Sequence, residues 1–183
     1  MMENENLENN MARLVLGGGC FWCTEGVYVN VKGVNKVVSS YTGGLRPNPT
    51  YENICTGATG HAEVIDIEYD ESVISLENLL EIFFVIHDPT TLNQQGADRG
   101  TQYRSVVYYS NEEEKKIIES AIAKAQTYFK DKIVTEVSEL GEVYPAEAYH
   151  QNFYNRNPSQ GYCQVVAAPK IQKFMTTFPQ FVG

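Results

Sequence analysis

The sequence predicts a single α+β domain, in which helices pack on a mixed β-sheet in two layers. The chain has 183 residues, which is the size of one domain and enough to bury a substantial core. Segments with the alternating apolar pattern of strands follow segments with the i, i+3, i+4 pattern of helices. No internal repeat or linker divides the chain, so we expect one domain at residues 13–183 after a flexible N-terminal tail at residues 1–12.

The individual elements follow from local patterns. Strands are expected at residues 13–16, 34–41, 61–69, 103–109 and 133–137. Helices are expected at residues 20–29, 76–84, 111–129 and 148–154, and from Pro169 onward. Ser75 is expected to cap the second helix, and Ser110 with Glu113 to form a capping box before the third. Two strand–helix–strand units in this order indicate a ferredoxin-like core with irregular additions.

Charge and hydropathy exclude two classes of partner. The formal net charge is −9 and no Lys- and Arg-rich run occurs, so we expect no nucleic-acid partner. No apolar stretch approaches the roughly 20 residues of a membrane helix. Residues 1–10 are polar and acidic, unlike a signal peptide. A cytoplasmic protein without membrane contact is therefore expected, and we take it to be a monomer, although the sequence does not reveal the oligomeric state.

The segment GGGCFWC is the richest chemical feature of the sequence. Cys20 follows three glycines and begins a predicted helix, where free backbone N–H groups and the helix dipole stabilise a thiolate. We therefore expect a lowered pKa for Cys20 and a nucleophilic role. The alternative is a buried structural cysteine beside a turn, which the glycines and the CxxC spacing to Cys23 disfavour.

Two aromatic residues and one glutamate complete the candidate chemistry. Phe21 and Trp22 are compatible with core packing, although their place beside Cys20 also lets them hold a small apolar group such as a methyl. Glu63 shares the apolar face of its strand with Ile65 and Ile67, so burial should raise its pKa and keep it protonated. An ion pair of Glu63 with Lys or Arg at the strand edge is an equally open reading.

Other polar residues give weaker signals. Asp98 and Tyr103 lie in the loop GADRGTQYRS and Tyr51 lies in NPTYE, and both segments are compatible with ordinary turns. A zinc site needs four ligands, usually in two close pairs, whereas only one CxxC pair is present. No metal and no nucleotide-binding loop are expected.

Seven motifs in order resemble type A peptide methionine sulfoxide reductases. They are GCFWCTE, YTGG, NPTYENICTG, TGHAEV, HDPTTLNQQG, GTQYRS and GYCQVV, and they run from about Gly17 to about Pro169. The resemblance implies that Cys20 is the nucleophile, that Phe21 and Trp22 hold the methyl group of the substrate, and that Glu63 protonates the sulfoxide oxygen. It also implies that Tyr51 and Tyr103 help bind that oxygen and that Asp98 is a polar residue of the same pocket.

The resemblance further implies reduction of the S diastereomer of methionine sulfoxide, free or in proteins, as a repair of oxidised proteins. Cys20 becomes a sulfenic acid, a second cysteine forms a disulfide with it, and thioredoxin or another dithiol reduces that disulfide without a bound cofactor. Many family members have Gly in place of Cys23 and a further cysteine in a Gly-rich tail. The candidates for the second cysteine are Cys23, which we favour, and Cys163, with Cys55 as a bystander.

Two other functions remain to be weighed. A general thiol–disulfide oxidoreductase also uses CxxC at a helix start, but by resemblance it needs a facing cis-proline loop that the sequence does not suggest. A non-catalytic metal-binding module would need more ligands than the chain offers. Activity on plain disulfides would favour the first, and stoichiometric zinc in the purified protein the second.

Overall fold

The computed structural model describes residues 10–183 and contains one six-stranded mixed sheet. Its strands are β1 (Met11–Gly17), β2 (Val34–Thr42), β3 (Ala62–Asp70), β6 (Val106–Tyr109), β7 (Glu136–Glu139) and β8 (Val143–Pro145). They occur in the order β7-β6-β1-β3-β2-β8. All neighbours are antiparallel except β6 and β7, which are parallel. The predicted mixed sheet is thus confirmed.

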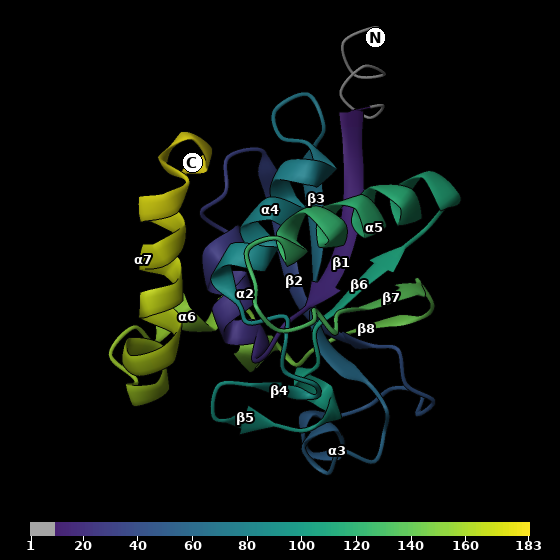
Figure 1. The fold of residues 1–183 in the computed structure, drawn as a ribbon. Helices are drawn as coiled ribbons and strands as arrows, with labels where there is room; N and C mark the ends of the chain where they lie inside the picture. The colour runs from purple at the N-terminus through teal and green to yellow at the C-terminus, as the bar shows by residue number, and fades with distance from the viewer. Residues whose placement is uncertain (1–9) are drawn as a thin grey trace, which may run out of the picture.

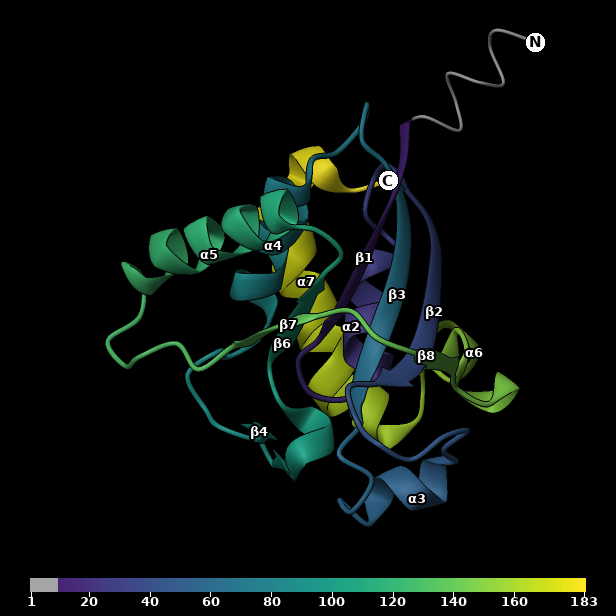
Figure 2. The same ribbon diagram turned by 90° about the vertical axis from the view of Figure 1, so that its right-hand side faces the viewer.

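Six α-helices accompany the sheet in the described part of the chain. They are α2 (Phe21–Tyr28), α3 (Tyr51–Cys55), α4 (Leu76–Ile86), α5 (Glu112–Gln126), α6 (Phe153–Arg156) and α7 (Ala168–Thr177). Figure 1 and Figure 2 show α2, α4, α5 and α7 covering one face of the sheet. In both views α3 lies below the lower end of the sheet, near the short hairpin of β4 (Gln94–Gln95) and β5 (Asp98–Arg99).

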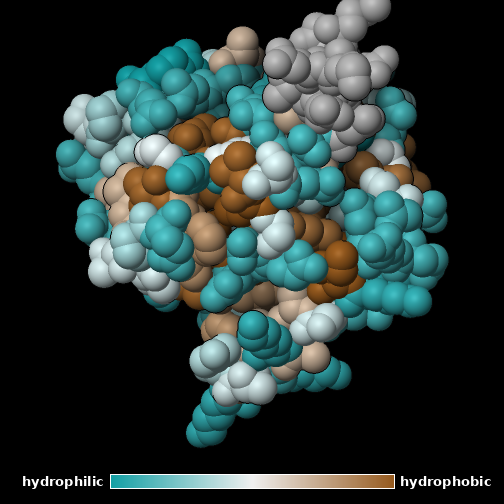
Figure 3. All heavy atoms as spheres, turned by 90° about the horizontal axis from the view of Figure 1, so that it is seen from above, coloured by the Kyte–Doolittle hydropathy of each residue, from teal (hydrophilic) through white to brown (hydrophobic). Residues whose placement is uncertain are grey.

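The apolar patterns explain why these layers form. In β3, Ile65, Ile67 and Tyr69 are buried against the helices, because alternate residues of a strand face the same side. Asp66, on the other side, pairs with Arg13 of β1 at 2.8 Å. In α4, the residues at helical spacing are buried and the Ser75 side chain accepts a hydrogen bond from the N–H of Asn78, as predicted. Seen from above, apolar side chains are also exposed among polar ones (Figure 3).

Several boundaries differ from the sequence prediction. The cap of α5 is Asn111 rather than Ser110, since the Asn111 side chain accepts from the N–H of Glu114 at 2.9 Å. The segment at residues 148–154 is divided into a 3₁₀ turn, Ala148–His150, and α6, because Asn152 between them has a positive φ of 55°. Met11 and Ala12, expected in the tail, belong to β1, and residues 1–9 of that tail lie outside the described residues.

Several further elements differ from expectation, among them β8 and the β4–β5 hairpin, which were not foreseen, and β7, which begins at Glu136 rather than at residue 133. Tyr103 ends a 3₁₀ turn, Thr101–Tyr103, so the strand expected from this residue begins only at Val106. The helix α3 occupies a segment that the prolines suggested was irregular. A π-helix, Cys163–Ala167, runs directly into α7 and packs against α2.

No helix within residues 10–183 is both long and apolar enough to cross a lipid bilayer.

Candidate active site

The glycine run places Cys20 at the lower end of the sheet, where β1 ends. At Gly17, a Cβ atom would lie 2.4 Å from the backbone oxygen of Glu63, so only glycine allows β1 to approach β3 this closely. Gly19 has a φ of 86°, a conformation that favours glycine, and its N–H donates to the backbone oxygen of Tyr103 at 3.1 Å. The turn therefore directs the chain into α2 with Cys20 as its N-cap.

Cys20 is a free, partly exposed cysteine at the N-terminus of α2. Burial and the nearby Glu63 raise the pKa of its thiol well above the ordinary value, whereas the N–H of Trp22 lowers it. The expected net lowering by the helix N-terminus is therefore wrong for the protein without substrate. The helix does donate to the sulfur, but the buried carboxyl group opposes the charge on the thiolate.

Glu63 lies beside this thiol on the buried face of β3, and only 1% of its surface is exposed. Its Oε1 accepts a hydrogen bond from the N–H of Phe21 at 3.2 Å. Burial raises the pKa of Glu63 to about 8, although the Phe21 N–H acts in the opposite direction. The expectation of a protonated carboxyl is confirmed, and neither ion pair among the described residues involves Glu63.

The two aromatic residues after Cys20 take different positions. Phe21 is fully buried, with its ring centroid 5.6 Å from that of Tyr41. Trp22 remains partly exposed and stacks on Phe153 at 3.7 Å, with 6° between the ring planes. Trp22 can therefore present a face to a small ligand, whereas Phe21 in this structure is a core residue beneath the site.

The three polar candidates from distant segments lie around the same end of the sheet. Tyr103 is close enough to Glu63 and Cys20 for their negative charges to raise its pKa, after the larger effect of burial. The Glu63 charge also contributes to the raised pKa of Tyr51, after the larger effects of burial and of Cys55. The charge of Asp98 acts on both Cys20 and Glu63. The structure thus brings all three together with the thiol and the acid.

Sequence reasoning missed three residues that hold this arrangement together. Tyr162 donates to the carboxylate of Asp98 at 2.5 Å. Glu147 accepts from the Tyr41 hydroxyl and from the Tyr51 N–H, both at 3.0 Å. His150 is fully buried against Trp22. The only signal in the sequence was position: Tyr162 precedes Cys163, and the other two lie at the start of the helix expected at residues 148–154.

A match to a protein-family model identifies the family of the chain that carries this site. The model of the family "Peptide methionine sulfoxide reductase" matches residues 12–181, nearly the whole chain. The chain belongs to this family. Its resemblance to type A reductases, noted from the motifs alone, is thereby confirmed.

Individual relatives agree with this membership. The reductase is 52% identical to the peptide methionine sulfoxide reductase MsrA of Polynucleobacter asymbioticus over 98% of this chain and 97% of that protein. It is 55% identical to the MsrA of a Nitratiruptor species over 92% of this chain and 97% of that protein. Among solved structures, reduced Mxr1 from Saccharomyces cerevisiae superposes with a TM-score of 0.81 at 33% identity, covering 85% of this chain and 90% of that one.

The other cysteines of the reductase occupy three different environments. Cys23 is buried one turn along α2, and its thiol donates to the Tyr162 hydroxyl at 3.8 Å. Burial raises the pKa of Cys23 to about 11, while Lys170 lowers it. Cys163 is fully buried at the start of the π-helix that packs on α2, near enough for its charge to act on Cys23. Cys55 is exposed on α3.

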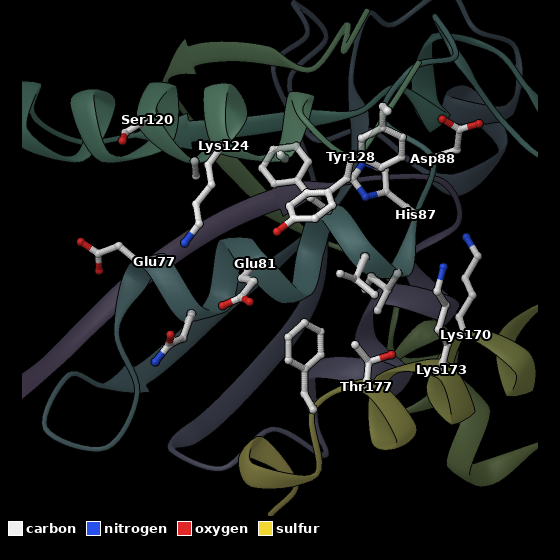
Figure 4. Close-up of a pocket in the computed structure, with 18 of the residues that line it drawn as sticks. Glu77, Glu81, His87, Asp88, Ser120, Lys124, Tyr128, Lys170, Lys173 and Thr177 are labelled. Atoms are coloured by element: carbon white, nitrogen blue, oxygen red, sulfur yellow. The ribbon is translucent and has the colours of Figure 1, made fainter. Parts of the chain in front are cut away.

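The predicted site residues lie apart from a large cavity in the described part of the chain. Within residues 10–183, no group of three or more His, Cys, Asp and Glu side chains is placed to hold a metal ion. The cavity opens between α4, α5 and α7 and contains none of the predicted site residues (Figure 4). Lys170 and His87 lie at one end of this cavity.

Proposed function

We propose that this methionine sulfoxide reductase acts on the S diastereomer, free or in proteins, with Cys20 as the nucleophile and Glu63 as the acid. Repair of oxidised proteins is the resulting role. The observation that supports this assignment most strongly is the buried Glu63, which has a pKa of about 8 and is held beside the Cys20 thiol through the Phe21 N–H. Such a group holds a proton at neutral pH and can deliver it.

The first step needs one proton shared between Cys20 and Glu63. When the sulfur of Cys20 attacks the sulfoxide sulfur as a thiolate, Glu63 holds that proton and transfers it to the sulfoxide oxygen. The S–O bond then breaks, methionine leaves, and the oxygen remains on Cys20 as a sulfenic acid. The sulfur of Cys20 is oxidised by two electrons and that of the substrate is reduced by two, so the step balances without a metal or a bound organic cofactor.

The orientation of the substrate would follow from the different residues that surround its sulfoxide sulfur. Trp22, above the buried Phe21, would hold the methyl group, since an aromatic face contacts a small apolar group well. Tyr51 and Tyr103, whose pKa values the charge of Glu63 helps to raise, would bind the oxygen. Asp98, fixed by Tyr162, supplies a further polar wall.

A second thiol would then regenerate Cys20. The thiol of Cys23 or Cys163 attacks the sulfenic acid, releases water and forms a disulfide, which an external dithiol reduces. We propose thioredoxin as this dithiol on the grounds of family membership. A solved structure described as Mxr1 from Saccharomyces cerevisiae in complex with Trx2 shares the fold, with a TM-score of 0.58 at 24% identity.

The same proposal extends to the type of fold, the oligomeric state, the location and the partners of the protein. In the order β6-β1-β3-β2 each strand is antiparallel to its neighbours, which is the arrangement expected of a ferredoxin-like core with β7 and β8 as additions. A monomer in the cytoplasm, without nucleic acid or membrane as partner, accords with a net charge of −9.

Turnover of the two purified sulfoxide diastereomers with a dithiol reductant tests the proposal. We expect reduction of the S form alone, because methyl, oxygen and lone pair each require a distinct place around the sulfur. Equal rates on both diastereomers would contradict the assignment of Trp22 and Glu63 to opposite sides of the substrate.

A further inference from the structure

The indole ring of Trp22 is held on three sides. Phe153 stacks on its face at 3.7 Å, and Tyr162 meets it edge-on at 5.8 Å. The third contact is polar: the indole N–H donates to Nδ1 of His150 at 3.0 Å. The first two contacts still allow the ring to slide in its own plane, whereas a hydrogen bond fixes one atom of the ring.

His150 is well suited to act as this fixed acceptor. It is fully buried at the end of the 3₁₀ turn Ala148–His150, with Phe21 and Tyr51 at centroid distances of 5.1 and 4.4 Å. Because Nδ1 accepts from Trp22, the proton of the neutral imidazole resides on Nε2. Burial lowers the pKa of His150, so the ring stays neutral and Nδ1 keeps its lone pair, although Glu147 acts in the opposite direction.

Burial of the His150 side chain carries a free-energy cost that packing alone does not explain. Nε2 of His150 is buried and has no hydrogen-bond partner among the described residues. A leucine or phenylalanine would fill an apolar site without leaving a buried polar atom unpaired. The histidine is therefore explained best by its one hydrogen bond, which is to Trp22.

We propose that His150 is a positioning residue for substrate selection, which holds the Trp22 ring at the distance from Cys20 that fits a methyl group. This inference rests on the proposed function, because it assumes that Trp22 contacts the substrate methyl. Without the acceptor, the ring can shift along Phe153 and the space for the methyl group changes. The loss then falls mainly on binding, so KM rises while kcat stays nearly constant.

Three substitutions separate this role from simple packing. His150→Leu removes the acceptor and keeps an apolar side chain of similar bulk. His150→Asn places an amide oxygen where Nδ1 lies and can still accept from Trp22. His150→Gln carries the same amide one bond further out, at the position of Nε2, where it cannot. Tyr149→Phe serves as a control, since Tyr149 also packs on His150, at 4.2 Å, but its hydroxyl group bonds to Glu147.

The first measurement is fluorescence with selective excitation of tryptophan, which reports on this ring alone because Trp22 is the single tryptophan of the chain. We expect a red-shifted emission for His150→Leu and His150→Gln, and a wild-type spectrum for His150→Asn and Tyr149→Phe. If His150→Leu does not fold by circular dichroism, the Asn and Gln variants still decide. Identical spectra for all four variants would overturn the proposal.

The second measurement is steady-state turnover of methyl and ethyl sulfoxides. For His150→Leu and His150→Gln we expect KM for the methyl sulfoxide to rise on the order of 5-fold, the usual effect of one neutral hydrogen bond, and preference for methyl over ethyl to fall. His150→Asn should restore both. A red shift without any change in KM or in preference would overturn the role in selection, and would leave the catalytic assignment of Cys20 and Glu63 untouched.

Discussion

The backbone N–H of Phe21 donates a hydrogen bond to Oε1 of Glu63 at 3.2 Å, although 42 positions separate the two residues in the chain. This bond joins the first turn of α2 to the buried face of β3. It keeps the carboxyl group beside Cys20, the residue that precedes Phe21, and it can persist whether Glu63 is charged or neutral. The acid is thereby positioned by the backbone, independently of any flexible side chain.

Replacing Glu63 by glutamine should slow sulfoxide reduction strongly and leave the fold intact. The amide of the Glu63→Gln variant retains an oxygen that accepts from the Phe21 N–H, so the architecture survives, but it cannot supply a proton. Loss of one positioned acid typically costs about 10²- to 10⁴-fold in rate. Single-turnover kinetics at pH 7, with circular dichroism as the control, measures both properties. A variant with nearly wild-type turnover would reduce Glu63 to a structural residue.

The rate of the reduction step should pass through a maximum as pH rises. The reactive form carries one proton on Glu63 and a thiolate at Cys20, so it is absent when both groups are protonated and also when both have lost their protons. Burial raises the pKa of Glu63 to about 8 and that of Cys20 well above its ordinary value, so the rate should rise as pH approaches about 8 and fall only where the second proton is lost. A pH profile of single-turnover rates tests this expectation. A rate that keeps rising with pH and never falls would show that thiol ionisation alone limits the step.

The free energy of unfolding should also depend on the protonation of Glu63, and it should fall as pH rises. The pKa of Glu63 is raised from 4.5 to about 8, so the folded state retains a proton that the unfolded state releases. The free energy of unfolding is therefore reduced progressively as pH rises from about 4.5 to about 8. Urea unfolding of wild type and Glu63→Gln at about pH 4.5 and about pH 8.5 measures this effect. We expect Glu63→Gln to gain stability relative to wild type at the higher pH. The same difference in free energy of unfolding at both pH values would contradict this expectation.

The sequence predicted the acid but not its effect on the nucleophile. The alternation of β3 was sufficient to place Glu63 on the buried face and to predict its raised pKa. The direction for Cys20 was wrong, because the helix start is visible in the sequence, whereas the burial of the thiol and the approach of Glu63 depend on how the chain packs and on how β1 pairs with β3. Tyr162 and His150 were missed for the same reason, since each acts only through side chains far away in the chain.

The pKa of the Cys20 thiol should therefore depend on the charge of Glu63. Its pKa is raised by burial and by Glu63, so Glu63→Gln should lower it by removing the negative neighbour. The pH dependence of alkylation by iodoacetamide, followed by mass spectrometry at Cys20, measures this pKa. Cys20→Ser serves as the control and should also abolish turnover. A pKa that is unchanged in Glu63→Gln would mean that the two groups do not interact.

The identity of the second cysteine gives the last prediction. Cys23 lies one turn along α2 from Cys20, and its N–H bonds to the Cys20 carbonyl at 3.1 Å, so a disulfide between them requires little chain movement. Cys163 is buried at the start of the π-helix, Cys163–Ala167, and that segment would have to move to bring it to Cys20. Burial raises the pKa of Cys23 to about 11, and Lys170 only partly offsets this, so it is position that favours Cys23.

We therefore expect Cys23 to attack the sulfenic acid first. The test is a single turnover of wild type, Cys23→Ser and Cys163→Ser, followed by peptide mapping of the disulfide. Wild type and Cys163→Ser should form a Cys20–Cys23 disulfide, while Cys23→Ser should accumulate the sulfenic acid. Exposed Cys55 provides the matched control, since Cys55→Ser should behave as wild type. Full recycling of Cys23→Ser by thioredoxin through a Cys20–Cys163 disulfide would instead identify Cys163 as the resolving residue.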